Sequence, residues 1–212
     1  MENNSADTVR LIELARAGDA AALNEMFSRH RERLRRMVEL RLDRRLQSRV
    51  DPSDVIQESY LDAARRLDEY LADARVPLFL WLRLVVGDRL RKLHREHLGT
   101  QMRDAGRELS LYRDPLPAAS SAALAAQLLG RLTSPTQAAV RAEQMIRVQE
   151  ALNALDPIDR EVICLRHFEG LSRAEAAQVL GIEEAATAKR LVRALARLKT
   201  VLAGMPGGLG GL

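Results

Sequence analysis

A run of basic side chains near the end of the chain has the clearest potential for chemistry. Residues 186 to 199 include no acid. The cations there are Lys189, Arg190, Arg193, Arg197 and Lys199. Cations along one helix can bind DNA phosphates, and an arginine in the major groove can also pair with guanine. A basic helix face that is only solvated would have the same composition. The elements around the run must therefore distinguish a DNA-binding helix from a solvated one.

The residues just before this run predict a helix-turn-helix. Asp156 and Pro157 supply an N-cap and a first-turn proline, which begin one helix. Ser172 and Glu175 have the spacing of a capping box and begin a second helix. Gly181 ends that helix because glycine readily adopts the left-handed conformation. The predicted buried stripe of the following basic helix is Leu191, Leu195, Leu198 and Leu202. This layout predicts a helix that enters the DNA major groove.

Other closely spaced functional side chains do not form a convincing catalytic or metal site. The pairs are His94 with His97, Cys164 with His167, and Asp54 with Glu58. Neither histidine-containing pair has a nearby third ligand, and nothing apolar and concave is predicted around the two acids to raise a pKa. The sequence also has no P-loop, serine elbow or zinc-protease pair. We therefore expect no enzyme activity, no metal and no cofactor.

Composition favours an all-α protein in the cytoplasm. Aromatic residues make up only 3% of the 212 residues, and Leu, Ala, Arg and Glu dominate, which argues against a β-rich fold. The single Cys164 excludes an intrachain disulfide and fits a reducing compartment. The polar start MENNSADTVR does not resemble a signal peptide, and the longest apolar run, Val76 to Leu82, is too short to span a bilayer. We expect no membrane association.

Helical periodicity and turn residues divide the chain into two small helical domains joined by a linker. A polar start is followed by a helix from Thr8, and later helices begin at Asp51-Pro52 and Leu78, with Pro77 interrupting the pattern between them. Glycine, proline, serine and alanine then mark a linker, in which SAALAAQLLGRL could form a docked helix. A further helix is predicted from Thr133-Ser134-Pro135. The predicted boundaries are 8–98 and 135–203 for the domains, 99–134 for the linker and 204–212 for a flexible tail.

The ordered set of motifs resembles bacterial sigma factors of the extracytoplasmic-function (ECF) group, from about Thr8 to Leu202. The segments that carry the resemblance are LARAGDAAALNEMF, DPSDVIQESYLDAARRLDEY, FLWLRLVVGDRL, LDPIDREVICLRHFEGLSRAEAAQVLGI and RLVRALARLK. The resemblance implies two helical domains, called sigma domains two and four. It also implies a protein that binds core RNA polymerase, holds the minus-ten and minus-thirty-five promoter elements, and directs transcription initiation.

The resemblance also implies three sets of contact residues. Those that grip the β′ clamp helices of the polymerase are Asp54, Gln57 and Glu58. Those at the minus-ten element are Trp81, Arg83, Arg89, Arg91, Lys92 and Arg95. Those at the minus-thirty-five element are Arg173, Thr187, Lys189, Arg190, Arg193 and Arg197; Ala186 and Ala188 stand where many relatives have threonine and lysine. Further implied partners are the β flap of the polymerase and an anti-sigma factor or other regulator.

Two other classes of protein are compatible with the same residues. One is a stand-alone helix-turn-helix regulator, which would bind a palindromic site as a dimer. The other is a helical adaptor that binds only protein and whose basic faces are solvated. Individual residues also have structural explanations: Asp54 could complete a helix start, Trp81 and Phe79 could belong to the core, and Glu183 and Glu184 could cap a helix.

Overall fold

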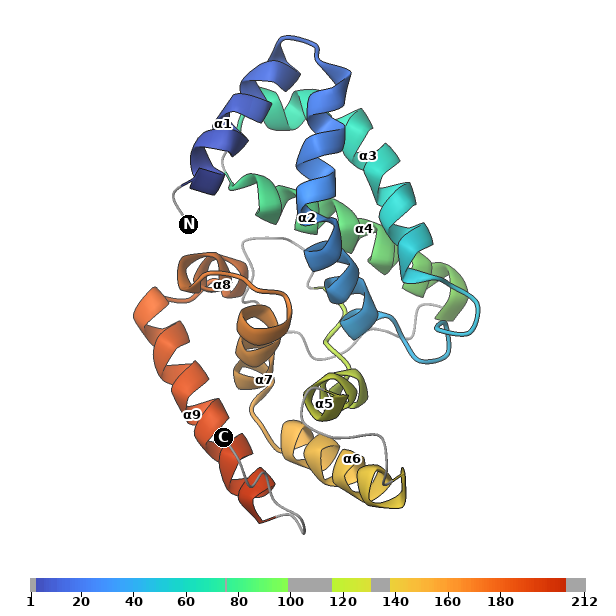
Figure 1. Cartoon of the computed structure of the whole chain (residues 1–212), viewed down its shortest axis with the longest axis vertical. Coiled ribbons are helices and arrows are strands. Elements are labelled where there is room, and N and C mark those ends of the chain that lie inside the picture. The colour runs from blue at the N-terminus through green and yellow to red at the C-terminus, as the bar shows by residue number, and fades with distance from the viewer. Residues whose placement is uncertain (1–2, 75, 99–115, 131–137, 205–212) are drawn as a thin grey trace. The chain divides into compact units, whose positions relative to one another are not determined.

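The computed structural model describes residues 3–74, 76–98, 116–130 and 138–204 (Figure 1). All regular structure among these residues is helical, which confirms the predicted all-α class. The chain divides into two compact units, Met1–Ala105 and Gly106–Leu212. Within the described ranges, no helix is both long and apolar enough to cross a membrane.

The N-terminal unit consists of four helices packed around α2. They are α1 (Asn3–Arg16), α2 (Ala20–Arg41), α3 (Pro52–Ala72) and α4 (Leu78–Leu98). Helix α2 packs against the other three, and α3 also packs against α4. Helix α1 begins before the predicted start at Thr8, because the polar residues ahead of it include no proline or glycine that would stop a helix.

Local sequence signals set the ends of these helices. The Asp51 carboxylate accepts a hydrogen bond of 2.7 Å from the Ser53 N–H, and Pro52 occupies the first turn, so α3 begins as predicted. Gly18, with φ of 87°, provides the left-handed residue that ends the first helical segment. The break between α3 and α4 precedes Pro77, also as predicted.

Aromatic stacking organises the core where α3 meets α4. The Trp81 ring stacks on Tyr70 with centroids 4.5 Å apart and 19° between the planes. The Tyr70 hydroxyl donates to the Val76 carbonyl at 3.2 Å and so ties the segment between the helices to the core. Burial raises the pKa of the Tyr70 hydroxyl, since the charged form would lose solvation. Trp81 therefore has a structural role in this core.

The C-terminal unit contains α5 (Ser121–Gly130), α6 (Ala138–Asn153), α7 (Pro157–Ile163), the π-helical turn η1 (Cys164–Phe168), α8 (Arg173–Leu180) and α9 (Glu184–Ala203). Helix α5, in the segment predicted as a linker, packs against α6. The Ser121 hydroxyl donates to the Asn153 side chain at 2.6 Å and accepts from Arg160 at 3.1 Å. The alanine- and leucine-rich segment is thus a docked helix of this unit. The predicted helix start at Thr133-Ser134-Pro135 lies outside the described residues.

The helix boundaries of the helix-turn-helix lie at the residues that the sequence predicts. Both hydrogen bonds of the capping box between Ser172 and Glu175 are present, and Gly181 is left-handed with φ of 63°. The buried stripe of α9 differs from the predicted row of leucines. The buried residues are Thr187, Ala194 and Leu198, whereas Leu191, Leu195 and Leu202 are half-buried. Helix α9 packs against α6, α7 and α8, and the small side chains of Thr187 and Ala194 share the close contacts with Leu198, while the other three leucines lie at the edges.

Candidate nucleic-acid and protein interfaces

Two of the three predicted polymerase-binding residues lie on the outer face of α3, and neither forms an ion pair with a described residue. Asp54 and Gln57 are exposed, while Val55 and Ile56 beside them point into the core. The third predicted residue, Glu58, forms an ion pair with Arg89 of α4. The predicted polymerase and minus-ten sites are therefore joined by one ion pair.

Leu61 lies on the same face and is the functional candidate that the sequence motifs did not reveal. Its side chain is 51% exposed. It follows Gln57 by four residues, so the two side chains are neighbours on the helix surface. Its sequence signal is its phase, because Leu61 falls outside the inward row of Ile56, Tyr60, Ala63 and Leu67. We define the α3 surface as Asp54, Gln57, Glu58 and Leu61.

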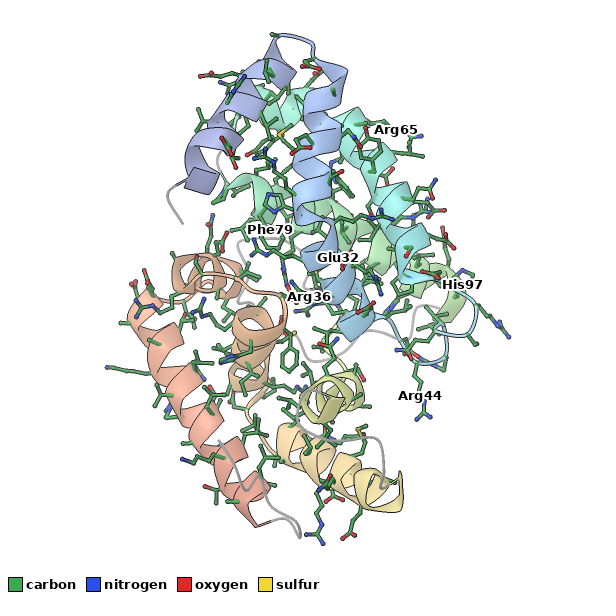
Figure 2. All side chains as sticks on the ribbon, in the orientation of Figure 1. Glu32, Arg36, Arg44, Arg65, Phe79 and His97 are labelled. Carbon is green, nitrogen blue, oxygen red and sulfur yellow. The ribbon has the colours of Figure 1, made fainter. Side chains whose placement is uncertain are left out.

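The predicted minus-ten residues separate into buried and exposed groups along α4. Trp81 is 7% exposed and Arg83 is 4% exposed, so neither presents a surface to DNA in this conformation. Apart from Arg83, residues 78–87 of α4 are apolar on every side, as expected for a helix enclosed by its neighbours. Phe79, labelled in Figure 2, is also buried, with the guanidinium of Arg33 from α2 lying 3.5 Å from its ring centroid.

Beyond this apolar half, α4 exposes cations in different states of pairing. Arg91 forms an ion pair with Asp88, which also pairs with Arg66 at 2.6 Å. Lys92 is exposed and lies 3.9 Å from Glu96. Arg95 is exposed, with no ion pair to any described residue. The end of α4 therefore offers Lys92 and Arg95 as its most accessible cations.

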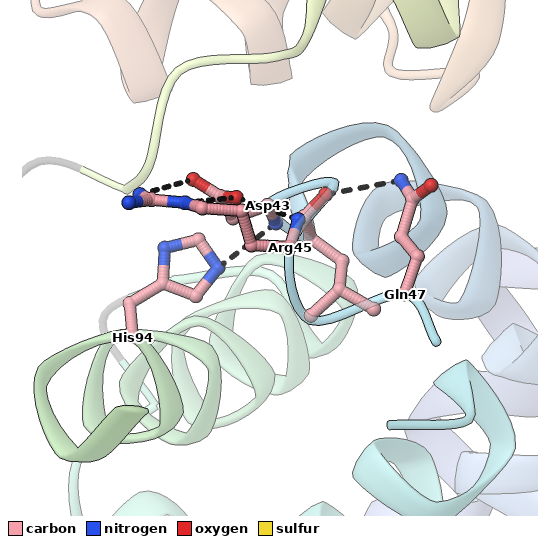
Figure 3. A network of polar contacts seen from close by, with 5 residues as sticks. Asp43, Arg45, Gln47 and His94 are labelled. Carbon is pink, nitrogen blue, oxygen red and sulfur yellow. Dashed lines mark hydrogen bonds and ion pairs between the residues drawn. The ribbon is translucent and has the colours of Figure 1, made fainter. Parts of the chain in front are cut away.

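A polar network connects the end of α4 to the loop that follows α2 (Figure 3). The Asp43 N–H donates to Nε2 of His94 at 3.3 Å, and the Asp43 carboxylate accepts two side-chain hydrogen bonds from Arg45, each of 3.0 Å. Hydrogen bonds from the Arg45 side chain and backbone lower the pKa of Asp43 to about 2. Burial lowers the pKa of His94, because the imidazolium would lose solvation. The network thus favours neutral His94 beside ionised Asp43.

Acidification below about pH 6.5 should destabilise the N-terminal unit through His94. Nε2 accepts a backbone hydrogen bond, so a second proton there would meet an N–H donor. With its folded pKa lowered, His94 binds protons more weakly than in the unfolded chain. Its stabilising contribution is therefore present above the unfolded pKa of 6.5 and is lost as pH falls toward the folded value. Hydrogen exchange of α4 amides at about pH 7 and about pH 5 measures this loss.

The matched variant for this prediction is His94→Gln, whose amide oxygen can accept from the Asp43 N–H but cannot titrate. Its protection should fall less than that of the wild type over the same pH interval. Titration of Asp43 does not affect this comparison. Its contribution to stability is lost only as pH falls below the ordinary aspartate pKa of 3.8 toward the folded pKa of about 2. Identical pH dependence in both proteins would contradict a role for His94.

Helix α9 presents three predicted DNA-contact residues on its exposed side. Lys189, Arg193 and Arg197 are exposed and recur every four residues, which aligns them along one side of the helix. They have no ion pair with any residue that the structure describes. We define these three side chains as the α9 basic row.

Two other predicted contact residues of α9 have structural partners instead. Thr187 is fully buried, and its hydroxyl donates to the Glu183 carbonyl at 3.2 Å. Arg190 is half-buried and donates to the carboxylate of Asp159 in α7 at 2.7 Å, with Asp156 at 3.7 Å. Thr187 therefore presents no exposed surface, and the ion pair directs the Arg190 guanidinium toward α7.

The start of α9 is connected to α8 by a surface ion pair. Arg173, the remaining predicted DNA contact, is exposed and lies 3.6 Å from Glu184. Glu183 occupies the N-cap position, but its side chain makes no cap hydrogen bond, so the expected capping role is not observed. Cys164 is buried, and its thiol donates to the Glu169 carboxylate at 3.5 Å. The described residues include no group of three potential ligands placed to hold a metal ion.

Comparison with known proteins connects this architecture to transcription. Residues 145–198, which cover most of α6 and the helix-turn-helix, match the family model described as Sigma-70, region 4. The ECF RNA polymerase sigma factor SigD of Mycobacterium tuberculosis (strain ATCC 25618 / H37Rv) is 30% identical over 183 residues, which cover 86% of this chain and 78% of SigD. The chain belongs to the ECF RNA polymerase sigma factors.

A second relative resembles this chain in both sequence and fold. The sigma factor CnrH of Cupriavidus metallidurans is 29% identical over 153 residues, covering 72% of this chain and 74% of CnrH. The solved structure of CnrH in complex with the cytosolic domain of CnrY has a TM-score of 0.54 at 25% identity and covers 95% of this chain and 99% of that chain. As a sigma factor, the protein directs promoter-specific transcription initiation, and the alternative of a stand-alone regulator is not favoured.

Proposed function

We propose that this sigma factor divides its work between three surfaces: the α3 surface binds core RNA polymerase, the end of α4 binds the minus-ten element, and the α9 basic row reads the minus-thirty-five element. The observation that carries the proposal is the α9 basic row, displayed by a capped helix-turn-helix within the segment that matches Sigma-70, region 4. A helix presented in this way fits the major groove of DNA.

Within the α9 basic row, we assign Arg193 to base recognition and Lys189 and Arg197 to phosphates. Arg193 occupies the middle of the row, and its fork of donors can pair with both acceptors of guanine. Phosphate contacts on either side would fix the orientation of the helix. Thr187 and Arg190 are omitted because one is buried and the other is paired with Asp159.

At the minus-ten element, Lys92 and Arg95 are the phosphate-binding candidates that the α4 geometry favours. Arg89 and Arg91 are half-buried and paired, so their contribution would require exchange of partners. The protein supplies no chemistry of its own in this proposal; it positions DNA and polymerase in the cytoplasm. CnrH was solved in complex with the cytosolic domain of CnrY, and we propose that an anti-sigma factor or other regulator likewise binds this chain.

Transcription reconstituted from purified components tests the proposed function. Core RNA polymerase of the source organism, with and without the full chain, is offered a library of random duplex templates, and the transcribed templates are sequenced. We expect a two-element promoter to be enriched only when the chain is present. The variant Lys189→Ala with Arg193→Ala should still bind core enzyme but should lose selection of the upstream element, because phosphate and base contacts are removed together.

Two outcomes would contradict this proposal. In the first, core enzyme gains no promoter-specific initiation while the free protein protects a palindromic site, as a dimeric regulator would. In the second, the double variant selects the same upstream element as the wild type, and the α9 basic row is then not the reader.

A further inference from the structure

The loop between α2 and α3, residues 42–51, has a defined conformation that is anchored by a buried side chain. Leu46 is 3% exposed and points into the unit. The Leu46 N–H donates to the Asp43 carbonyl at 2.8 Å, and the Leu46 carbonyl accepts from Arg49 and Val50 at 2.9 Å each. The Gln47 amide also donates to the Leu42 carbonyl at 3.2 Å. The loop can therefore present its side chains in a fixed arrangement.

The hydrogen bond between Asp43 and His94 places this loop beside the C-terminal part of α4 (Figure 3). The two residues are 51 positions apart in the sequence, so the contact joins segments that motifs treat separately. His94 is 4% exposed, which shows that the joint between loop and helix is closed. Cations from both segments consequently occupy one end of the N-terminal unit.

The side chains at this end are predominantly basic and exposed. The loop contributes three arginines and two aspartates, and residues 91–98 of α4 contribute two arginines, a lysine and a glutamate, so cations outnumber acids by six to three. Arg44, Arg49 and Arg95 are exposed and have no ion pair in the described ranges. Figure 2 labels Arg44 and His97, which project from the loop and from the end of α4. We define Arg44, Arg45, Arg49, Lys92 and Arg95 as the composite basic surface.

The chemistry of this surface fits DNA better than protein. Among the described residues of the N-terminal unit, the large exposed apolar ones are Val9, Leu14 and Leu61, and none belongs to the loop or to the end of α4. A protein interface would have an apolar or aromatic centre, whereas a nucleic-acid interface is polar and strongly positive. Arginine side chains at the surface can bind phosphates of either strand without reading sequence.

The same surface fits duplex better than single-stranded DNA. Single-strand binding uses exposed aromatic rings as platforms for unstacked bases. Phe79 and Trp81 of α4, and Tyr70 stacked on Trp81, are all buried. A surface that offers cations without an exposed Phe, Tyr or Trp ring matches the regular backbone of a double helix.

We infer that the composite basic surface, including the loop between α2 and α3, binds phosphates of the duplex that adjoins the minus-ten element. This inference rests on the proposed sigma-factor function and extends it to a loop outside the predicted contact residues. The loop would add fixed cations beside Lys92 and Arg95, so one protein surface would hold the duplex next to the segment that is opened. Such contacts raise affinity without adding sequence preference.

The test uses holoenzyme assembled from core polymerase and the full chain. Its DNA is a promoter fragment obtained from the template selection described above. The variant Arg44→Gln with Arg49→Gln removes two exposed charges, and Arg10→Gln with Arg31→Gln is the matched control because both arginines are exposed on α1 and α2. We expect the slope of log affinity against log salt to become shallower by about 2 for the loop variant and to stay unchanged for the control.

A second probe, a single-stranded minus-ten oligonucleotide, isolates the duplex contribution. The loop variant should bind this probe like the wild type, which would support the inference. An equal loss on single-stranded DNA would overturn the duplex assignment, and a loss of core-polymerase affinity would assign the surface to protein. An unchanged salt slope on the promoter fragment would also overturn it. If holoenzyme with the wild-type chain selects no promoter, the proposed function itself is contradicted. That result can be told apart from the effects of the loop variant, because it appears without any substitution.

Discussion

Replacing Asp159 with alanine should weaken binding to the minus-thirty-five element, although Asp159 itself is not proposed to touch DNA. Its buried carboxylate accepts from Arg190 at 2.7 Å and joins the first turn of α7 to α9. Without this acceptor, the half-buried guanidinium loses its nearer partner and keeps only Asp156 at 3.7 Å, so α9 is held less firmly beside the basic row. Breaking a fully buried pair costs about 3–5 kcal/mol. Because the Arg190 side chain is 27% exposed, we expect a smaller cost of about 1–3 kcal/mol.

Hydrogen exchange of α9 amides and promoter binding by the reconstituted holoenzyme measure the two effects together. The control is Arg193→Ala, since Arg193 is exposed and has no ion pair in the described residues. This control should weaken DNA binding without reducing protection of α9, whereas Asp159→Ala should reduce both. The double variant Asp159→Ala with Arg190→Ala should cost less than the sum of the single changes, because the two side chains interact directly.

The outcome that contradicts this positioning role involves Arg190 alone. The sequence motif places Arg190 among the DNA-contact residues, and a direct reader would lose DNA discrimination on Arg190→Ala without loss of stability. The structure predicts the opposite, because the change leaves a buried carboxylate without its partner. Unaltered protection of α9 in Arg190→Ala would therefore restore the sequence-based assignment.

Features that depend on three or four neighbouring residues could be predicted from the sequence. The capping box at Ser172 and Glu175, the left-handed Gly181, and the start of α3 at Asp51 each arise from local hydrogen bonds or backbone sterics. No packing partner needs to be known for such signals. The segmentation of the helix-turn-helix therefore followed directly from the residues.

The sequence could not predict whether an individual cation is paired, buried or accessible, because this depends on partners that are distant in sequence. Arg190 meets Asp159 over 31 positions, and Arg89 also meets Glu58 over 31 positions. Motif spacing gives no measure of such pairing, so paired and accessible arginines look alike in the sequence. Trp81 and Arg83 show the same limit: burial follows from how α2 and α3 enclose α4.

Replacing Leu61 with aspartate should reduce affinity for core RNA polymerase more than any other single change on the α3 surface. Leu61 is 51% exposed and is the large apolar side chain on the outward face of α3, whose other exposed residues are polar or alanine. Protein interfaces concentrate binding energy in a few apolar anchors that become desolvated, and a charge placed there would lose its hydration. We expect a loss of about 2 kcal/mol or more, equivalent to roughly 30-fold in the dissociation constant. Competition binding with purified core enzyme measures it.

Val9→Asp provides the matched control, since Val9 is 53% exposed in the same unit but lies on α1. It places the same charge on a comparably exposed apolar residue outside the α3 surface, so core affinity should stay at the wild-type level. Because the Leu61 side chain is half-exposed, hydrogen exchange of α3 should change little in Leu61→Asp, which separates lost contact from lost folding. Wild-type affinity for Leu61→Asp, together with wild-type affinity for Asp54→Ala with Gln57→Ala, would mean that another surface binds the polymerase. Equal losses in Leu61→Asp and Val9→Asp would instead indicate a general effect of added negative charge.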